Sequence, residues 1–161
     1  MLGYRSAGGR YWKVFLDHPF DTVSSTNKVA YLDGLTGAQA VALLSSSFFW
    51  WYYSTHFDMY NLKDYMVFGF RFSAAKESTL EQLQTLGQQL LSALEAQATL
   101  KEVRIQRYGK RISRRYTVST AKPLIDAIDA VLAQHYGVST AAYQFIIHYD
   151  SKYRMAASRL R

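Results

Sequence analysis

Seven cationic side chains fall within a short segment in the second half of the 161-residue chain. They are Lys101, Arg104, Arg107, Lys110, Arg111, Arg114 and Arg115, and Glu102 is the one acidic residue among them. Such an excess of one sign exceeds the mixed charges that keep an ordinary surface soluble. Ammonium and guanidinium groups at this density are typical of sites that bind phosphates, so the segment predicts a polyanion-binding surface.

This segment accounts for nearly all of the basic excess of the chain. The first 98 residues carry 7 cations and 8 anions, a net charge of −1, whereas the remaining 63 residues carry 12 cations and 4 anions, a net charge of +8. The charge is therefore a local feature with a position in the fold, and its function depends on the elements that display it.

The same segment has the pattern of a β-hairpin. Residues 103–108 and 112–118 are β-prone runs on either side of Gly109 and Lys110, a pair typical of a turn. A two-stranded ribbon fits the major groove of DNA. We expect phosphate contacts from six side chains of this hairpin, with two tyrosines interleaved among them: Arg104, Arg107, Lys110, Arg111, Arg114 and Arg115, with Tyr108 and Tyr116.

Motifs for metal, nucleotide and serine-hydrolase chemistry are absent from the sequence. There is no cysteine, the four histidines are not spaced as metal ligands, and no glycine-rich phosphate loop or GxSxG motif occurs. One weak catalytic candidate is the acid-x-lysine pair Asp150 and Lys152, a spacing found in metal-dependent nucleases. A small nuclease is therefore one alternative, although we expect no metal site from local spacing.

The pattern of the remaining chain predicts an α+β fold. Short strands are expected at residues 11–16 and 29–32, a helix at 38–53, a strand at 65–72, and a helix from Thr79 with a Ser78 to Glu81 capping box. Two further helices are expected after the hairpin, the first with Pro123 in its first turn and Gly137 at its end, the second capped by Ser139. We divide the chain into an aromatic-rich module, residues 1–75, and a module of helix, basic hairpin and helix pair, residues 76–161.

Residues 34–57 form an aromatic stretch without Asp, Glu, Lys or Arg. A buried helix explains it better than a membrane span, because a serine block and several Trp and Tyr residues interrupt the apolar run. The first 15 residues lack the continuous apolar core of a signal peptide, and the absence of cysteine suits a reducing compartment. We therefore expect a cytoplasmic protein without a membrane partner.

Two segments resemble the target-recognition and C-terminal regions of bacterial N6-adenine DNA methyltransferases of restriction-modification systems, of the type IIG kind. Residues 46–53 (SSFFWWYY), followed by residues 61–64 (NLKD), are similar to a phrase written roughly as NSSLFYWWW and an L-x-x-D/E step. Residues 128–138 and 145–155 are similar to the closing phrase IDxxLAxxYGLTxxExxFIIxYDxKYRM, the more specific of the two. Together the similarities extend over residues 5–155.

The departures from that family concern the catalytic parts. Its methyltransferase domain has a glycine-rich loop for S-adenosylmethionine and an [N/D/S]-P-P-[Y/F/W] motif, but this chain has only two prolines, Pro19 and Pro123, and lacks both features. Ser45 also stands where the family phrase opens with Asn. The resemblance therefore implies a recognition part that binds no cofactor itself, with S-adenosylmethionine on a partner methyltransferase or restriction subunit.

The sequence thus predicts a protein that binds double-stranded DNA without catalysing methyl transfer. Besides the hairpin, Arg5, Arg10, Lys13 and Arg71 are candidates for the DNA face of the aromatic module. A structural or protein-interaction subunit that docks through its aromatic helix is a second alternative, beside the nuclease. The DNA sequence, the partner chain and the oligomeric state stay open.

Overall fold

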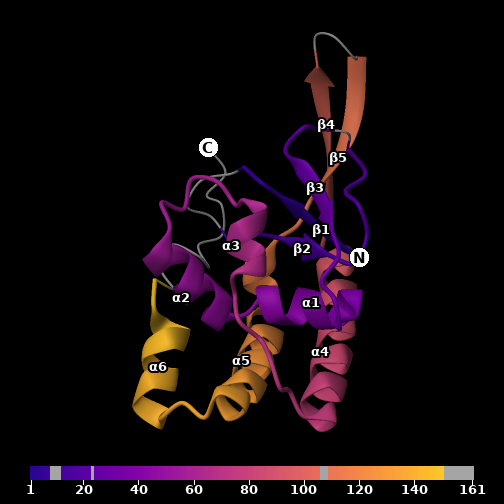
Figure 1. Cartoon of the computed structure of the whole chain (residues 1–161). Coiled ribbons are helices and arrows are strands. Elements are labelled where there is room, and N and C mark those ends of the chain that lie inside the picture. The colour runs from indigo at the N-terminus through magenta and orange to yellow at the C-terminus, as the bar shows by residue number, and fades with distance from the viewer. Residues whose placement is uncertain (8–11, 23, 106–108, 151–161) are drawn as a thin grey trace.

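The computed structural model describes residues 1–7, 12–22, 24–105 and 109–150, and for residues 103–105 and 111 it describes the backbone only. The described strands and helices occur in separate runs along the chain, which confirms the predicted α+β class (Figure 1). In chain order they are β1 (Leu2–Arg5), β2 (Phe15–Leu16), β3 (Asn27–Ala30), α1 (Gly37–Leu44), α2 (Ser47–His56), α3 (Asp64–Phe68), α4 (Glu77–Ala96), β4 (Thr99–Ile105), β5 (Gly109–Arg115), the 3-10 turn η1 (Val118–Ala121), α5 (Lys122–Tyr136) and α6 (Thr140–His148).

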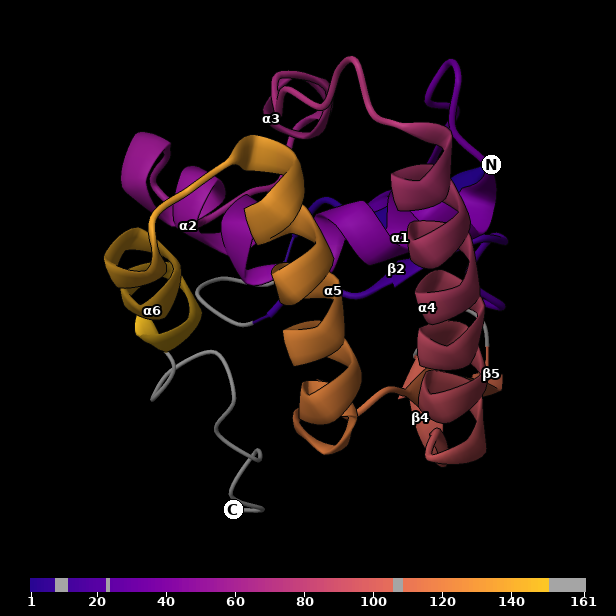
Figure 2. The same cartoon turned by 90° about the horizontal axis from the view of Figure 1, so that it is seen from below.

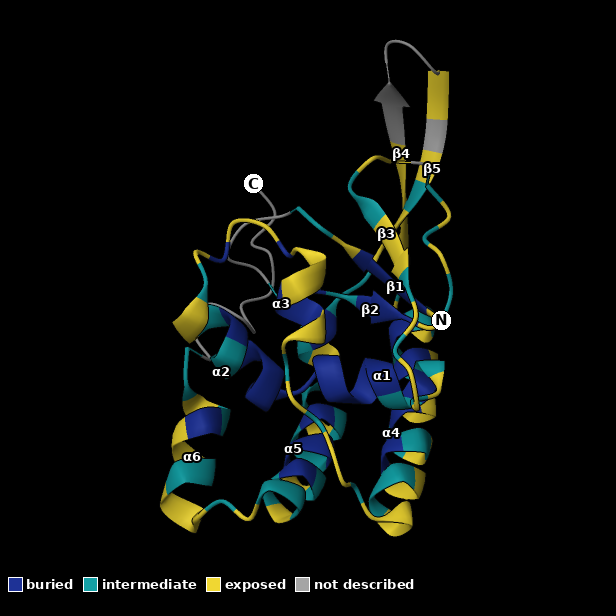
Figure 3. Ribbon diagram, viewed as in Figure 1, coloured by how far each residue is buried: buried dark blue, intermediate teal, exposed yellow. Residues whose placement is uncertain are grey.

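Helices and a small sheet are stacked in layers. Helices α4, α5 and α6 stand beside one another, and α1 and α2 cross above them (Figures 1 and 2). An antiparallel sheet of order β2-β1-β3 covers the other side of α1. One hydrophobic core joins buried residues of both the 1–75 and the 76–161 segments, and α1 is its most completely buried helix (Figure 3).

The close approach of α1 and α4 requires a glycine. A Cβ atom on Gly87 would lie 2.0 Å from the carbonyl oxygen of Ala38, so an alanine there would force the two helices apart. Leu83, Leu90 and Leu94 flank this glycine on the buried face of α4. The leucine spacing of this segment therefore marks packing within the chain, as the sequence pattern indicates.

The hairpin β4-β5 forms a separate two-stranded ribbon and extends beyond the helical layers (Figure 1). Its strands pair in antiparallel register from Thr99 opposite Arg115 to Ile105 opposite Gly109. The hairpin prediction is confirmed, but both strands begin earlier than predicted. Gly109, expected in the turn, is the first residue of β5, and its φ of +74° explains the preference for glycine.

Local cap signals predict the last two helices correctly. Pro123 lies in the first turn of α5, and Gly137 follows the helix in the left-handed conformation with φ +62°. Ser139 caps α6, because its side chain accepts a hydrogen bond from the backbone N–H of Ala142 at 3.3 Å. These positions depend on nearby backbone atoms alone, which is why sequence suffices to find them.

The single helix predicted over residues 38–53 is wrong, since the chain forms α1 and α2 with a break between them. The Ser46 hydroxyl donates to the carbonyl oxygen of Leu43 at 2.6 Å and accepts from the N–H of Phe49 at 3.1 Å. It thereby ends one helix and caps the next, and serine side chains commonly compete with helix continuation in this way. The interruption turns α2 so that its aromatic rings point into the core.

Three other boundaries predicted from pattern are also wrong. Residues 65–72 hold helix α3 in place of a strand, because Met66 and Val67 are both buried, whereas a strand would bury alternate residues. Helix α4 starts at Glu77, with Ser78 inside its first turn, so the proposed capping box does not form. Of the early strand at residues 11–16, only Phe15–Leu16 pairs with β1.

A buried carboxylate joins the two predicted modules. Asp129 on α5 is fully buried, and its Oδ1 accepts a hydrogen bond from the backbone N–H of Ser47 at 2.7 Å. This amide is one of the unpaired donors at the start of α2, where the helix dipole also favours a negative charge. The contact fixes the aromatic helix against α5.

We expect Asp129→Ala to lower the free energy of unfolding by about 2 to 3 kcal/mol, because it leaves a buried amide without its acceptor. Chemical denaturation followed by circular dichroism would measure the loss. The matched control is Asp126→Ala on the same helix, which removes only the partly exposed ion pair with Lys122 and should cost about 0.5 kcal/mol or less. Equal losses in the two variants would contradict a special role for Asp129.

Candidate nucleic-acid interface

The register of the ribbon separates its cations onto two faces. Successive side chains of a strand point to opposite faces, so Lys101, Ser113 and Arg115 share one face. Lys110 and Arg114 lie on the other, together with Glu102 and two exposed apolar side chains, Leu100 and Ile112. The cations counted together in the sequence therefore have different surroundings.

Arg114 is held by carboxylates of its own chain. Its Nε lies 2.9 Å from Oδ2 of Asp21, and its Nη1 donates to Oε2 of Glu95 on α4. The hydrogen bond that Arg114 donates to Glu95 raises the pKa of the guanidinium, and the charge of Asp21 raises this pKa further. Glu95 also accepts from the Tyr116 hydroxyl at 2.8 Å, and burial together with this bond raises the pKa of Tyr116 to about 12. Arg114 thus fastens the base of the ribbon to the helical body.

Lys110 also has a partner within the ribbon. Its Nζ lies 2.9 Å from Oε1 of Glu102, in a pair whose two side chains are largely exposed. Exposed pairs of this kind contribute little energy and exchange readily for other ions. A phosphate could therefore replace Glu102 at Lys110 far more easily than it could replace the two carboxylates at Arg114.

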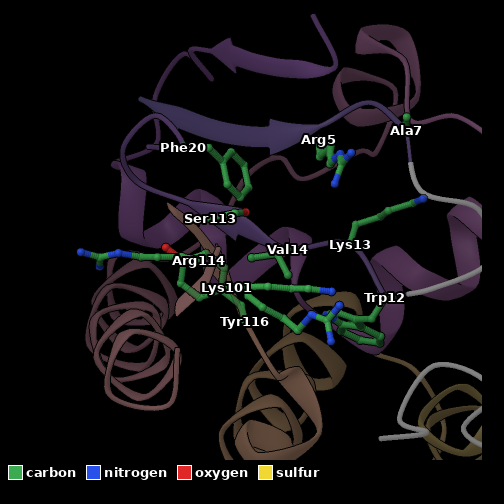
Figure 4. Close-up of a pocket in the computed structure, with 11 residues that line it drawn as sticks. Arg5, Ala7, Trp12, Lys13, Val14, Phe20, Lys101, Ser113, Arg114 and Tyr116 are labelled. Carbon is green, nitrogen blue, oxygen red and sulfur yellow. The ribbon is translucent and has the colours of Figure 1, made fainter. Parts of the chain in front are cut away.

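Cations from distant parts of the chain meet at one pocket beside the ribbon base. The pocket has a volume of about 390 Å³. Figure 4 shows Arg5 and Lys101 directed toward the space around Val14, whereas the side chain of Arg114 runs away from it. The described residues that line the pocket include no acidic side chain and are Arg5, Ala7, Trp12, Lys13, Val14, Phe20, Lys101, Ser113, Arg114, Arg115 and Tyr116. We call this the basic pocket.

The positive charges of the basic pocket come from both predicted modules. Arg5 ends β1, and its Nε donates to Oγ1 of Thr26 at 3.3 Å. Lys101 and Arg115 are exposed on the ribbon, and within the described chain neither has a carboxylate at ion-pair distance. Like charges that converge without neutralisation create a positive potential, which favours an anion at this place.

Lys13 is the buried cation of the pocket wall. Its side chain is only 6% exposed, and its Nζ lies 5.8 Å from the centre of the Tyr53 ring. Burial lowers the pKa of Lys13 to about 8, with a further contribution from the charge of Arg5. An anion in the pocket would offset both effects and favour the protonated amine.

Of the other predicted DNA-binding residues, the structure describes the side chain of Arg71. Arg71 is exposed but borders a separate, largely apolar pocket between α2 and α5, so the structure does not bring it to Arg5 and Lys13. Arg104 and Arg111 have described backbones in β4 and β5. Arg10 and Arg107 lie outside the described residues.

The structure describes one of the two catalytic candidates. Asp150 follows α6 with a φ of +54°, and Lys152 lies outside the described residues. In the ranges that the structure describes, no three His, Asp or Glu side chains are grouped closely enough to hold a metal ion. None of the described helices is both long and apolar enough to cross a bilayer.

Sequence reasoning did not select Lys101 or Trp12 as site residues. Lys101 belongs to the cationic segment, but only the strand register shows that it lies opposite Ser113 and lines the pocket with Arg5. Trp12 borders the pocket while its ring stacks on Trp50 at 5.5 Å. In the sequence, Trp12 is notable only as an aromatic residue next to Lys13, and the pattern of this segment predicts a strand and not a pocket.

The aromatic side chains of α2 suggested a docking surface, but most of them pack against other residues of the same chain. Phe48, Phe49, Trp50 and Tyr53 are buried. Their rings contact other rings of the same chain, for example Phe48 with Tyr136 at 5.5 Å. This helix is therefore central to its fold, and the sequence alone could not distinguish that arrangement from coverage by a partner.

Comparison of the chain with protein-family models, with curated proteins and with solved structures gave no match.

The buried Lys13 predicts that the protein becomes more stable as the pH rises above about 8. The folded state disfavours the charged amine, whereas the unfolded chain retains the ordinary pKa of 10.5. Between these values the unfolded chain binds more protons, so stability rises with pH, by up to about 1.4 kcal/mol per pH unit. Urea denaturation at about pH 7.5 and about pH 9.5 should show a gain of roughly 1 to 2 kcal/mol.

Lys13→Met is the control for this measurement, because it removes the titrating group and keeps an apolar chain of similar length. The gain should disappear in this variant. The tyrosines with raised pKa values oppose the gain at about pH 9.5, because the unfolded chain begins to lose their protons below its tyrosine pKa of 10.0. This loss is common to both proteins, so the difference between the two profiles reports Lys13 alone. A wild-type profile with the same pH dependence as that of Lys13→Met would show that the amine remains hydrated.

Proposed function

We propose that this chain binds double-stranded DNA through the basic pocket and the adjoining face of the ribbon. The observation that carries the proposal is the convergence of Arg5, Lys101 and Arg115, from three separate strands, on a concave surface whose described lining has no acidic side chain. Placement of cations by the fold, rather than their number in the sequence, distinguishes this surface from a solvated basic face.

The ribbon is exposed, and a two-stranded ribbon is a shape that the major groove admits. It extends from the helical layers, and its described residues from Thr99 to Glu102 are exposed (Figure 3). In this proposal Lys101 and Arg115 contact phosphates beside the groove, and Lys110 joins them by exchanging Glu102 for a phosphate. Phosphate contacts set position and orientation, and contacts with base edges supply specificity.

Arg114 has a different role in this proposal from the one that its sequence position suggested. It positions the ribbon through Asp21 and Glu95, so its own contribution to phosphate binding is small. The six ribbon cations predicted from the sequence thus have different roles in this proposal: Arg114 holds the ribbon in place, and the others bind phosphates. Contacts from Arg104 and Arg107 remain part of the proposal.

The resemblance to adenine methyltransferases suggests where such DNA binding would be used. We propose that the chain acts as a target-recognition part of a restriction-modification system, with methyl transfer or cleavage supplied by another chain. The absence of the catalytic methyltransferase motifs from the sequence agrees with this division of work. S-adenosylmethionine would then bind the partner.

The proposal predicts the salt dependence of DNA binding. The double variant Lys101→Gln, Arg115→Gln should bind a blunt duplex about 10-fold more weakly at moderate salt. It should also reduce the slope of log affinity against log salt by about 2, since each lost phosphate contact removes about 0.9. Fluorescence anisotropy of a labelled duplex at several salt concentrations measures both quantities.

The control is the double variant Lys63→Gln, Lys76→Gln, which makes the same change in net charge. Both lysines are exposed and precede helices α3 and α4, and neither lines the basic pocket. This variant should keep the wild-type slope. If the two double variants lose affinity equally, binding reflects net charge and not the basic pocket.

A further inference from the structure

The basic pocket has two chemically distinct walls. Arg5, Lys101 and Arg115 supply positive charge, whereas Trp12, Val14 and Phe20 supply aromatic and aliphatic surface. A surface that only contacts the sugar-phosphate backbone needs the first wall and gains nothing from the second. The volume of about 390 Å³ lies within the range of pockets that hold small molecules.

The concave shape also limits which part of a nucleic acid can enter. The bases of an intact duplex are stacked on each other and paired, so their faces are hidden from an aromatic wall. A nucleotide outside the pairing exposes both its phosphate and the face of its base. Charged and aromatic side chains in combination are the usual means by which proteins bind such nucleotides.

We propose that the basic pocket accommodates one unpaired nucleotide of a DNA strand next to a duplex held by the ribbon. Its phosphate contacts Arg5 and Lys101, and its base lies against Trp12. This inference rests on the proposed function, because the ribbon must first bind the duplex. It adds that the protein distinguishes DNA with an unpaired nucleotide from fully paired DNA.

The ring contacts around Trp12 support a fixed aromatic wall. Trp12 stacks on Trp50 with an angle of 14° between the rings, and Trp50 is 2% exposed in the core. The indole is therefore supported from behind by a buried side chain. A wall that is already ordered loses little entropy when a base packs against it.

Three DNAs with the same duplex test the inference by fluorescence anisotropy. The first is blunt, the second carries a single-stranded overhang of about six nucleotides, and the third carries an overhang of abasic nucleotides of the same length. The abasic overhang adds the same phosphates without bases. The base-bearing overhang should bind about 10-fold more tightly than the abasic one, as expected from one stacked base.

Two variants remove the proposed contact in different ways. Trp12→Leu removes the aromatic wall, and Ser113→Phe fills the pocket from the ribbon, where a strand residue tolerates an aromatic side chain. Both should abolish the preference for the base-bearing over the abasic overhang. This preference is a ratio of two affinities measured on the same variant, so any general loss of duplex affinity cancels from it. Tyr31→Leu, which removes an exposed tyrosine outside the pocket, should keep the preference.

The possible outcomes separate this inference from the proposed function. Equal affinities for the base-bearing and abasic overhangs, or a preference that persists in Ser113→Phe, would overturn the inference and leave duplex binding intact. No binding to any of the three DNAs would overturn both. If Trp12→Leu fails to fold, Ser113→Phe decides the question alone, because Ser113 is not a core residue.

Discussion

Arg114 bridges Asp21, in the loop between β2 and β3, and Glu95, at the end of α4, and this ionic contact joins the base of the ribbon to both elements. Phe20 adds an edge-to-face contact with Tyr116 at 6.4 Å between ring centres. The charged and the aromatic contact act on the same end of the ribbon. Because strand side chains alternate, fixing Arg114 toward these acids directs Lys101 and Arg115 toward Arg5.

The basic pocket therefore depends on acidic residues that do not line it. Asp21 and Glu95 neutralise one cation of the ribbon and, by holding it, assemble the others. The buried amine of Lys13 lines the same pocket as the cations of β1 and of the ribbon. Burial of this amine and its proximity to other positive charges both destabilise its protonated form, and a bound anion would offset both effects.

The sequence was sufficient for most features whose signal is local, with the capping box expected at Ser78 as an exception. Pro123, Gly137 and Ser139 predicted helix ends because caps depend on the neighbouring backbone. The hairpin followed from two β-prone runs around a glycine. These features determined the α+β class and the order of elements in the second half of the chain.

The sequence was insufficient where tertiary contacts outweighed local pattern. The apolar run of residues 65–72 fits a strand from its pattern, and the burial of two successive residues of α3, Met66 and Val67, agrees with a helix. In the sequence, the serine block at residues 45–47 only argues against a membrane span. In the structure, the hydroxyl of Ser46 separates two helices. Lys13 was expected at the surface, yet it is buried.

The division of the ribbon cations shows why counting charges is a poor guide to binding. The sequence presents Arg114 and Arg115 as equivalent neighbours, and both border the pocket, but Arg114 is engaged by two carboxylates whereas Arg115 has none at ion-pair distance within the described chain. An arginine that already has charged partners releases little free energy when it meets a phosphate, because it must first lose those contacts. The ribbon therefore attracts an anion less strongly than its formal charge suggests. The attraction is concentrated on the face of Lys101 and Arg115, where Arg5 and Lys13 of the other module add to the positive potential. A surface assembled in this way requires the complete fold, since neither segment of the chain has the pocket by itself.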